Sequence, residues 1–399
     1  MIFSSLYIHI PFCIHRCGYC DFNTYAGLQG LIPAYSQAVC AELEYLSQSV
    51  IERLTIHTIY FGGGTPSLVP ANHLGEILAT IQNNFYLLPS PEVTLEANPR
   101  TVSEEYLIQI RRLGVNRISL GMQSADQNEL TMLERQHTYS DVMRAVKWSR
   151  KAGINNLNLD LIFGLPCQTL KSWLISVEAA LSLQPEHLSL YSLTLEHGTP
   201  MQRKVETGIL SETDPDTAAD MYEAASERLT KAGYFQYEIS NWALVNDSGE
   251  QYSCKHNLQY WRNLPYIGVG AGAHGFINHY RTVDIATPGG YIRRMQNKSP
   301  VPEDRYGFPS TPATIKMNSI NTDTEIGETM MMGLRLVLEG ISDQDFYQRY
   351  GVNLEEQFGI QIERLISFGL LEWTESEGKR LRLTNKGHLL GNQVFKEFI

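Results

Sequence analysis

The chain has 399 residues, too many for one small core, and its length predicts a large domain with a smaller one attached. Hydrophobic residues make up 43% and charged residues 19%, ordinary proportions for a soluble globular protein. The net charge of −11 argues against a general binder of nucleic acids or anionic membranes, because such ligands attract cationic surfaces.

The first residues contain no signal peptide and no apolar stretch long enough for a membrane-spanning helix. We therefore expect a cytoplasmic protein, with peripheral contact at a membrane left open. Six cysteines in a chain of this size do not indicate a disulfide framework, and three of them lie within one short loop.

That loop follows the first predicted strand. Cys13, Cys17 and Cys20 have the spacing C-x3-C-x2-C, close enough to gather around one inorganic centre, and thiolates are the ligands of iron-sulfur clusters. A cubane [4Fe-4S] cluster has four irons, so three cysteines would leave one iron open to an exchangeable ligand. Tyr19, just before the last cysteine, suits a ring that packs beside such a ligand.

Two alternatives remain for this loop. One is a zinc site of Cys3His type that uses His9, His15 or His57, and the other is three ordinary buried thiols. Zinc loops usually pair cysteines as C-x2-C with a distant second pair, and the sequence has no such pair, which favours the cluster.

From Leu6 to about Ala243 a strand followed by a helix recurs six times, the pattern of a parallel sheet with crossover helices. The predicted strands are Leu6 to Ile10, His57 to Phe61, Glu92 to Ala97, Arg117 to Met122, Asn156 to Ile162 and His187 to Leu195. The predicted helices include Pro33 to Leu46, Ser103 to Leu113, Ser140 to Ala152 and Thr169 to Leu183. Six units favour an α/β fold with a partial (β/α)6 barrel over a flat sheet.

Polar and glycine residues cluster where these strands end, as expected for the functional end of a barrel. The run Gly62-Gly63-Gly64-Thr65-Pro66 follows the second strand, and glycines without a Cβ let the backbone approach a ligand. A plain tight turn is the alternative. Glu96 and Asp160 are acceptors suited to ribose hydroxyls, and Arg135 has the fork that pairs with a carboxylate.

After a helix at about 214–232, a stretch rich in aromatic, glycine and histidine residues begins at Cys254. We expect a loop that covers or binds a flat aromatic ligand, with His256 as a candidate metal ligand and Tyr260 and Trp261 as packing surfaces. A structural lid over the barrel mouth is the alternative.

The remaining chain divides into a linker and a small domain. Residues 297–323 are rich in Pro, Ser and Thr and indicate a linker or surface insertion. Beyond them, two helices and a hairpin predict a winged-helix pattern. With eight Lys and Arg against twelve Asp and Glu in 325–399, DNA binding is disfavoured. The expected domains are thus 1–243, a barrel; 244–323, the aromatic segment and linker; and 324–399, a winged-helix-like domain.

Together these motifs resemble the radical S-adenosylmethionine (SAM) superfamily. The resemblance implies that Cys13, Cys17 and Cys20 bind a [4Fe-4S] cluster whose fourth iron is chelated by the amino and carboxylate groups of SAM. It further implies that SAM contacts come from Tyr7, Tyr19, Gly63, Gly64, Thr65, Glu96, Gln123, Arg135 and Asp160.

Within that superfamily the whole chain resembles the HemW family of haem chaperones, which is related to the oxygen-independent coproporphyrinogen III oxidase. Phe22 stands where the oxidase pattern has a fourth cysteine, and only twelve residues precede Cys13, where the oxidase carries an N-terminal extension. The segment H-N-x-x-Y-W, here His256 to Trp261, is the HemW signature associated with haem binding.

The resemblance implies a haem chaperone with a cluster and SAM that lacks oxidase activity and passes haem to an unidentified acceptor, for which a membrane-bound respiratory protein is one candidate. The alternative is the oxidase itself, an enzyme that decarboxylates coproporphyrinogen III with a 5′-deoxyadenosyl radical. We expect His256 to be the axial haem ligand, with Cys254, His274 and His279 as rivals. The sequence has no C-x2-C-H motif, so a c-type covalent link to haem is not expected.

Overall fold

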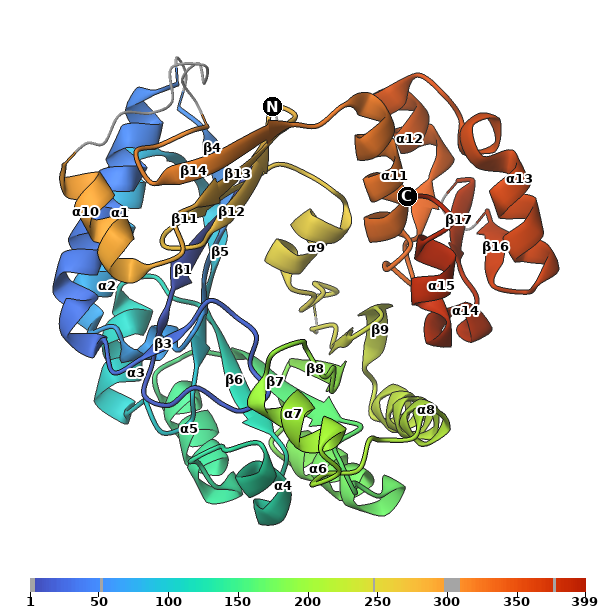
Figure 1. Cartoon of the computed structure of the whole chain (residues 1–399), viewed down its shortest axis with the longest axis horizontal. Helices are drawn as coiled ribbons and strands as arrows, with labels where there is room; N and C mark the ends of the chain where they lie inside the picture. The colour runs from blue at the N-terminus through green and yellow to red at the C-terminus, as the bar shows by residue number, and fades with distance from the viewer. Residues whose placement is uncertain (1–3, 51–52, 247, 298–308, 376–377) are drawn as a thin grey trace. The chain divides into compact units, whose positions relative to one another are not determined.

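The computed structural model describes the chain except residues 1–3, 51–52, 247, 298–308 and 376–377, and the chain forms two compact units (Figure 1). The first unit comprises Met1–Arg228 and Pro265–Asn318, and the second comprises Leu229–Leu264 and Ser319–Ile399. This division differs from the three consecutive domains expected from the sequence. The reason is that the chain after residue 264 returns to the first unit and adds strands to its sheet.

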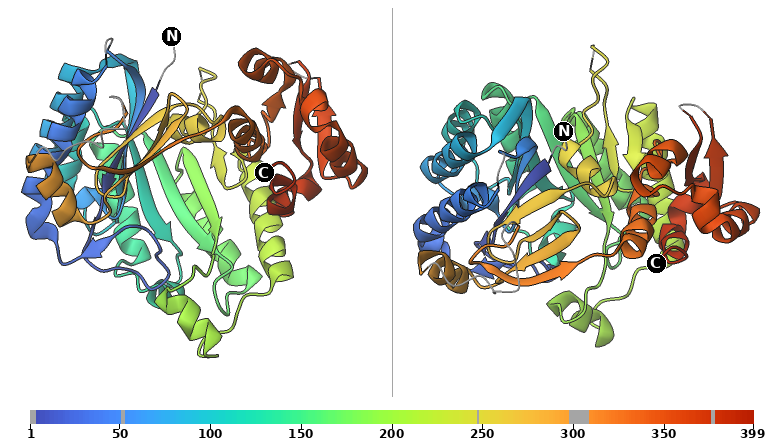
Figure 2. Two further views of the ribbon diagram at one scale, coloured as in Figure 1. Left: turned by 45° about the horizontal axis from the view of Figure 1, so that its top comes forward. Right: turned by 90° about the horizontal axis from the view of Figure 1, so that it is seen from above.

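The first unit contains the expected partial (β/α)6 barrel. Its strands pair in parallel in the order β1 (Ser4–Ile10), β4 (Thr55–Gly63), β5 (Tyr86–Ala97), β6 (Arg117–Gln123), β7 (Asn156–Phe163) and β8 (His187–Ser192). The helices of this part of the chain are α1 (Ile32–Gln48), α2 (Ala71–Asn84), α3 (Glu104–Arg112), α4 (Gln127–Met132), α5 (Tyr139–Lys151), α6 (Leu170–Ser182), α7 (Pro200–Glu206) and α8 (Pro215–Lys231). Helices α1, α2, α3, α5 and α6 lie along one face of the sheet (Figures 1 and 2).

Side-chain caps fix where several of these helices begin. Thr138 and Asp141 form a capping box at the start of α5, because each side chain hydrogen-bonds the backbone amide of the other. Ser103 caps α3 by accepting a hydrogen bond from the amide of Tyr106. The helices predicted from periodicity therefore begin within a residue or so of their expected positions.

The sheet continues beyond β1 in a way that the sequence did not predict. β11 (Tyr266–Val269) pairs in parallel with β1, and β12 (His274–Ile277), β13 (Tyr280–Asp284) and β14 (Thr314–Ser319) follow in that order. Between β13 and β14 lies α10 (Pro288–Gln296), and a small pair, β2 (Phe12–Cys13) and β3 (Tyr25–Ala26), forms near the cysteine loop. The expected linker 297–323 is thus wrong for 314–319, which form a strand, and its residues 298–308 lie outside the described part.

The two faces of the barrel strands differ in chemistry. Apolar residues of β6 and β7 alternate with polar ones, and both sets are largely buried. The polar set includes Arg117, Ser119, Asn158 and Asp160, and because alternate side chains of a strand point to opposite faces, it shares one face. Barrel interiors are usually filled by branched apolar side chains. The polar residues of β6 and β7 therefore differ from the usual apolar filling of a barrel, and they place hydrogen-bonding groups on this face of the sheet.

The second unit has the winged-helix arrangement expected for the C-terminal region. It contains β9 (Phe235–Glu238), β10 (Asn241–Ala243), α9 (Lys255–Trp261), α11 (Thr322–Gly333), β15 (Ile341–Ser342), α12 (Asp343–Tyr350), α13 (Leu354–Ser367), β16 (Leu371–Thr374), β17 (Arg380–Leu383), α14 (Asn385–Leu389) and α15 (Gly391–Phe395). β15, β17 and β16 form an antiparallel sheet in that order. The apolar core of the second unit includes Leu334, Phe346, Leu365 and Leu381. In the described residues, no helix is both long and apolar enough to cross a membrane.

Candidate functional site

The cysteine loop lies directly after β1, at the carboxyl end of the barrel strands. Cys13 ends β2 and is buried, whereas Cys17 and Cys20 are partly exposed. The Thr65 hydroxyl donates a hydrogen bond to the Cys13 sulfur at 3.6 Å. Among the residues that the structure describes, no three His, Cys, Asp or Glu side chains converge on a single metal ion. A cluster does not require such convergence, because each of its thiolates binds a different iron.

Backbone hydrogen bonds join the end of the glycine run to the start of the cysteine loop. The Gly64 amide donates to the Ile10 carbonyl at 2.8 Å, and the Thr65 amide donates to the Phe12 carbonyl at 2.8 Å. A Cβ on Gly64 would lie 2.7 Å from the Phe12 oxygen and 3.1 Å from the Cys13 sulfur. Only glycine therefore allows the strand end to approach the cysteine loop this closely.

Glu96, at the end of β5, is held by two donors. The Tyr60 hydroxyl donates to Oε1 at 2.8 Å, and the Gly63 amide donates to Oε2 at 3.1 Å. Burial raises the pKa of Glu96 to about 7, while these two hydrogen bonds oppose that rise. The Tyr7 ring stacks on Tyr60 with centroids 6.2 Å apart, and its hydroxyl lies 3.0 Å from Nδ1 of His9. Tyr7, Gly63 and Glu96 are thus brought together as expected.

Asp160 lies on the same face, on β7. Its Oδ2 accepts a hydrogen bond from the Ser119 hydroxyl at 2.9 Å, and its Oδ1 accepts one from the Asn158 amide at 2.7 Å. Burial raises the pKa of Asp160, and the donors oppose this effect. Ser119 and Asn158 were not singled out from the sequence. Their alternation with leucine and isoleucine along β6 and β7 is the signal that marks them.

Arg135 links the cysteine loop to β6. Its Nη1 donates to the Cys17 sulfur at 3.8 Å and its Nη2 donates to the Gly121 carbonyl at 3.2 Å. Its Nε is buried and has no hydrogen-bond partner among the described residues. A buried donor without an acceptor is costly, so the geometry suits a ligand that brings a carboxylate, as the methionine end of SAM does.

Two further expected residues flank Arg135. Burial raises the pKa of Tyr19, while the positive charge of Arg135 opposes the rise. The Tyr19 side chain packs against a buried cluster that consists of Leu133, Ile162, Leu165 and Met201. Gln123 ends β6 at a register irregularity and has a φ of 64°, a backbone conformation that L-residues seldom adopt.

Glu134 is a component of the site that the sequence did not reveal. Its carboxylate accepts hydrogen bonds from His15 Nε2 at 3.1 Å and from Lys204 Nζ at 3.2 Å, and it lies against the backbone of Gly18. The Gly18 carbonyl also accepts a hydrogen bond from the Met201 amide at 2.9 Å. These contacts fasten the cysteine loop to α7. They join residues far apart in sequence, which no local pattern predicts.

The segment His256 to Trp261 forms helix α9, not the expected loop. His256 is 1% exposed, and its Nε2 lies 3.0 Å from the Tyr260 hydroxyl, one helical turn further along. Trp261 packs under Arg335, whose guanidinium carbon lies 4.4 Å from the ring centroid. Tyr260 and Trp261, which we expected to form packing surfaces for a flat ligand, thus contact other side chains of the second unit.

The rival haem ligands do not share a loop with His256. Cys254 is buried next to the start of α9, in the second unit. His274 begins β12 and His279 lies in the turn between β12 and β13, both in the first unit. The sequence suggested one common loop because these residues are close along the chain, but Cys254 belongs to the same unit as His256, whereas His274 and His279 belong to the other.

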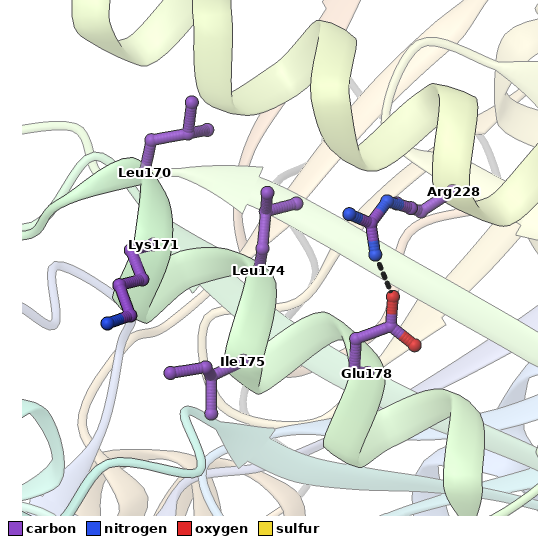
Figure 3. Close-up of a pocket in the computed structure, with 6 residues that line it drawn as sticks. All are labelled: Leu170, Lys171, Leu174, Ile175, Glu178 and Arg228. Atoms are coloured by element: carbon purple, nitrogen blue, oxygen red, sulfur yellow. Dashed lines mark hydrogen bonds and ion pairs between the residues drawn. The ribbon is translucent and has the colours of Figure 1, made fainter.

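A pocket of about 640 Å³ lies elsewhere, beside α6 and Arg228 of α8 (Figure 3). It is lined by Leu170, Lys171, Leu174, Ile175, Glu178 and Arg228. An ion pair between Glu178 and Arg228 closes one side. None of the expected cofactor-binding residues lines this pocket.

Comparisons with known proteins agree with this architecture. Residues 7–180 match the Radical SAM superfamily, and residues 320–390 match the HemN C-terminal domain. The haem chaperone HemW of Bacillus subtilis is 37% identical over 99% of this chain and 99% of its own length. HemW of Mycobacterium tuberculosis is 36% identical over 99% of this chain and 94% of its own length.

A solved structure is similar across the whole chain. Coproporphyrinogen III oxidase (HemN) from Escherichia coli, described as a radical SAM enzyme, matches with a TM-score of 0.81 and 21% identity, covering 100% of this chain and 90% of the oxidase. At this level of identity the match establishes the fold.

Proposed function

The chain belongs to the HemW family of the radical SAM superfamily, and we propose that it is a haem chaperone that binds haem and transfers it to an acceptor protein. The similarity to HemW proteins over essentially the full length is the observation that carries this proposal. Membership of the superfamily implies a [4Fe-4S] cluster and SAM as cofactors.

In this proposal Cys13, Cys17 and Cys20 hold the cluster. The methionine end of SAM lies beside Arg135, whose buried Nε lacks an acceptor among the described residues, and beside the glycine run with Thr65. When bound, the cluster supplies an open coordination position and a redox centre. The chain's own residues shape the place: Arg135 donates to the Cys17 sulfur and Thr65 donates to the Cys13 sulfur.

The rest of SAM is assigned to residues of the barrel strands β5 and β7. Glu96 and Asp160 accept hydrogen bonds from the ribose, because carboxyl oxygens on this face are the acceptors suited to hydroxyl groups. In this proposal the walls of the SAM site are completed by Tyr7, Tyr19 and Gln123. The contacts between Tyr60, Gly63 and Glu96 support this assignment, since they hold the carboxyl in one orientation before any ligand arrives.

Haem is assigned to the segment His256 to Trp261, with His256 as the axial ligand through its imidazole. The Tyr260 hydroxyl occupies Nε2 of this histidine, so ligation through that atom requires Tyr260 to move away. A carrier that must release haem benefits from such competition, because an internal partner for the imidazole weakens the site and offers haem a route out.

Oxidase activity is not part of the proposal. Phe22 stands at the position of the oxidase's fourth cysteine, and its side chain is 63% exposed. The likeness to the solved oxidase concerns the fold alone. Decarboxylation of coproporphyrinogen III is the alternative function, and an assay for vinyl-group formation distinguishes the two.

Haem titrations followed by the Soret band test the assignment. We expect His256→Ala to weaken haem binding about tenfold or more and to alter the spectrum, since it removes the ligand. Tyr260→Phe removes the competing hydroxyl and should tighten binding. His279→Ala is the matched control, a histidine in a turn of the first unit, and should behave as wild type. A wild-type spectrum and affinity in His256→Ala would show that haem is held elsewhere.

A further inference from the structure

A network of hydrogen bonds that includes Asp160 spans the three neighbouring strands β6, β7 and β8. The Asn158 amide nitrogen lies 2.7 Å from Oδ1 of Asp160 and 2.7 Å from the Ser119 oxygen. The Ser119 hydroxyl in turn donates to Oδ2 of Asp160 at 2.9 Å. Both carboxyl oxygens therefore receive a donor from the protein.

The other end of the Asn158 side chain is equally constrained. Its oxygen lies 2.6 Å from Nδ1 of His187 and accepts a hydrogen bond from the Ser189 hydroxyl at 3.1 Å. His187 is fully buried, and burial together with the nearby positive charge of Arg117 lowers its pKa well below the usual value. The ring is thus neutral, and because the amide oxygen only accepts, Nδ1 carries its proton.

The orientation of the Asn158 amide follows from the carboxylate of Asp160. A carboxylate oxygen only accepts, so the amide group of Asn158 faces Asp160 with its nitrogen and His187 with its oxygen. An inverted amide would bring two acceptor oxygens together at Asp160, whereas a neutral His187 can accept at Nδ1 in its other tautomer. The carboxylate of Asp160 therefore fixes the orientation of the amide, and the amide oxygen fixes the proton of His187 on Nδ1.

Strand register brings these residues side by side. Ser119 on β6 is level with Asn158 on β7, Asn158 is level with His187 on β8, and Asp160 is level with Ser189. All are buried or nearly so on the polar face of the sheet. Burying polar groups costs free energy unless they are paired, and apolar residues would fill a barrel more simply. The arrangement thus indicates a role beyond packing.

The structure points to Asn158 and Ser119 as positioning residues for Asp160, and we propose that they hold its carboxylate oriented for the SAM ribose, while His187 and Ser189 donate to the Asn158 oxygen. This inference rests on the proposed placement of SAM beside Asp160. Besides these neighbours, the charged groups that face Asp160 are Arg117 from β6 and Glu96 from β5. Burial disfavours the ionised carboxyl, and the donors counteract it.

A double-mutant cycle on the full chain, reconstituted with its cluster without oxygen, tests the proposal through SAM affinity measured by calorimetry. Asn158→Leu and Ser119→Ala should each weaken SAM binding about fivefold to tenfold in the wild-type background. In an Asp160→Asn background the same changes should alter the affinity less than about twofold, because the residue through which they act is already altered. Ser119→Ala is a small change that keeps the test decisive if Asn158→Leu does not fold.

Thr94→Val is the matched control. Thr94 is fully buried on β5, on the face of Glu96, and its hydroxyl has no hydrogen-bond partner among the described residues, so its loss should leave SAM affinity unchanged. Equal losses from the Asn158 and Ser119 changes in both backgrounds would reveal a merely structural role and overturn the proposal. Wild-type affinity in Asp160→Asn itself would overturn the placement of SAM, which is a different and separately visible failure.

Discussion

Glu96 retains its proton at a pH where most carboxyl groups have lost theirs. Burial raises its pKa to about 7, against the opposing hydrogen bonds from Tyr60 and Gly63. Near neutral pH the side chain is therefore divided between a neutral acid and a carboxylate. Only the carboxylate is purely an acceptor, and its hydrogen bonds to hydroxyl groups are stronger than those of the neutral acid.

This titration predicts a pH dependence of SAM binding. As the pH rises from about 6 to about 8, Glu96 ionises and SAM should bind about threefold to tenfold more tightly. Glu96→Gln cannot ionise, so its affinity should change only as far as SAM's own groups titrate. Calorimetry on both proteins across this range gives the difference directly, and identical pH profiles would remove Glu96 from the SAM site.

At the scale of elements, the sequence predicted the barrel because each strand and helix carries its own local signal. β6 and β7 alternate apolar and polar residues, and α3 and α5 begin at capping residues. The extension by β11 to β14 has no such signal, because its pairing with β1 joins segments more than 250 residues apart.

The residues of the candidate site also fall into a group that the sequence predicted and a group that it did not. Residues on the predicted strands, such as Glu96 and Asp160, followed from the repeating pattern, whereas Glu134 and His187 act through contacts between distant segments. The short helix α9 was expected to be a loop, since its aromatic and polar composition resembles a binding segment. The spacing of His256 and Tyr260, which brings both side chains together on one face of a helix, is the sequence signal that indicates this helix.

The buried acid that joins α1 to the sheet extension gives a test at this scale. Glu42 on α1 accepts hydrogen bonds from the Tyr291 hydroxyl at 2.6 Å, the Thr311 hydroxyl at 2.6 Å and the Gly270 amide at 3.0 Å. Burial raises the pKa of Glu42, and burial followed by the charge of Glu42 raises that of Asp284 on β13 well above its usual value. We infer that the pair retains a proton in the folded chain.

The sign of the pH effect follows from these raised pKa values. The unfolded chain loses the proton at ordinary carboxyl pKa values, so the folded state loses stability as the pH rises through the folded pKa. The urea midpoint of the cofactor-free protein should therefore fall as the pH rises from the ordinary carboxyl range, about 4, toward the raised folded pKa. Asp284→Asn removes one of the two acids and donates to the other, so its midpoint should fall less. Parallel curves for both proteins would mean that the pair does not share a proton.

For the whole molecule, the two proposed chemistries lie in separate compact units. The cysteine loop and the residues assigned to SAM belong to the first unit, and His256 to Trp261 belong to the second. The relatives over the full length are haem chaperones, whereas the solved structure with the same fold is an oxidase. The decisive question for the whole chain is which of the two activities it has.

One preparation can answer it. The protein, reconstituted without oxygen and shown by iron and sulfide content to carry its cluster, is divided between a haem titration followed by the Soret band and an assay with coproporphyrinogen III, SAM and a reductant. We predict saturable haem binding and no conversion of propionate to vinyl groups at a useful rate. Efficient vinyl formation without saturable haem binding would contradict the chaperone and identify the chain as an oxidase.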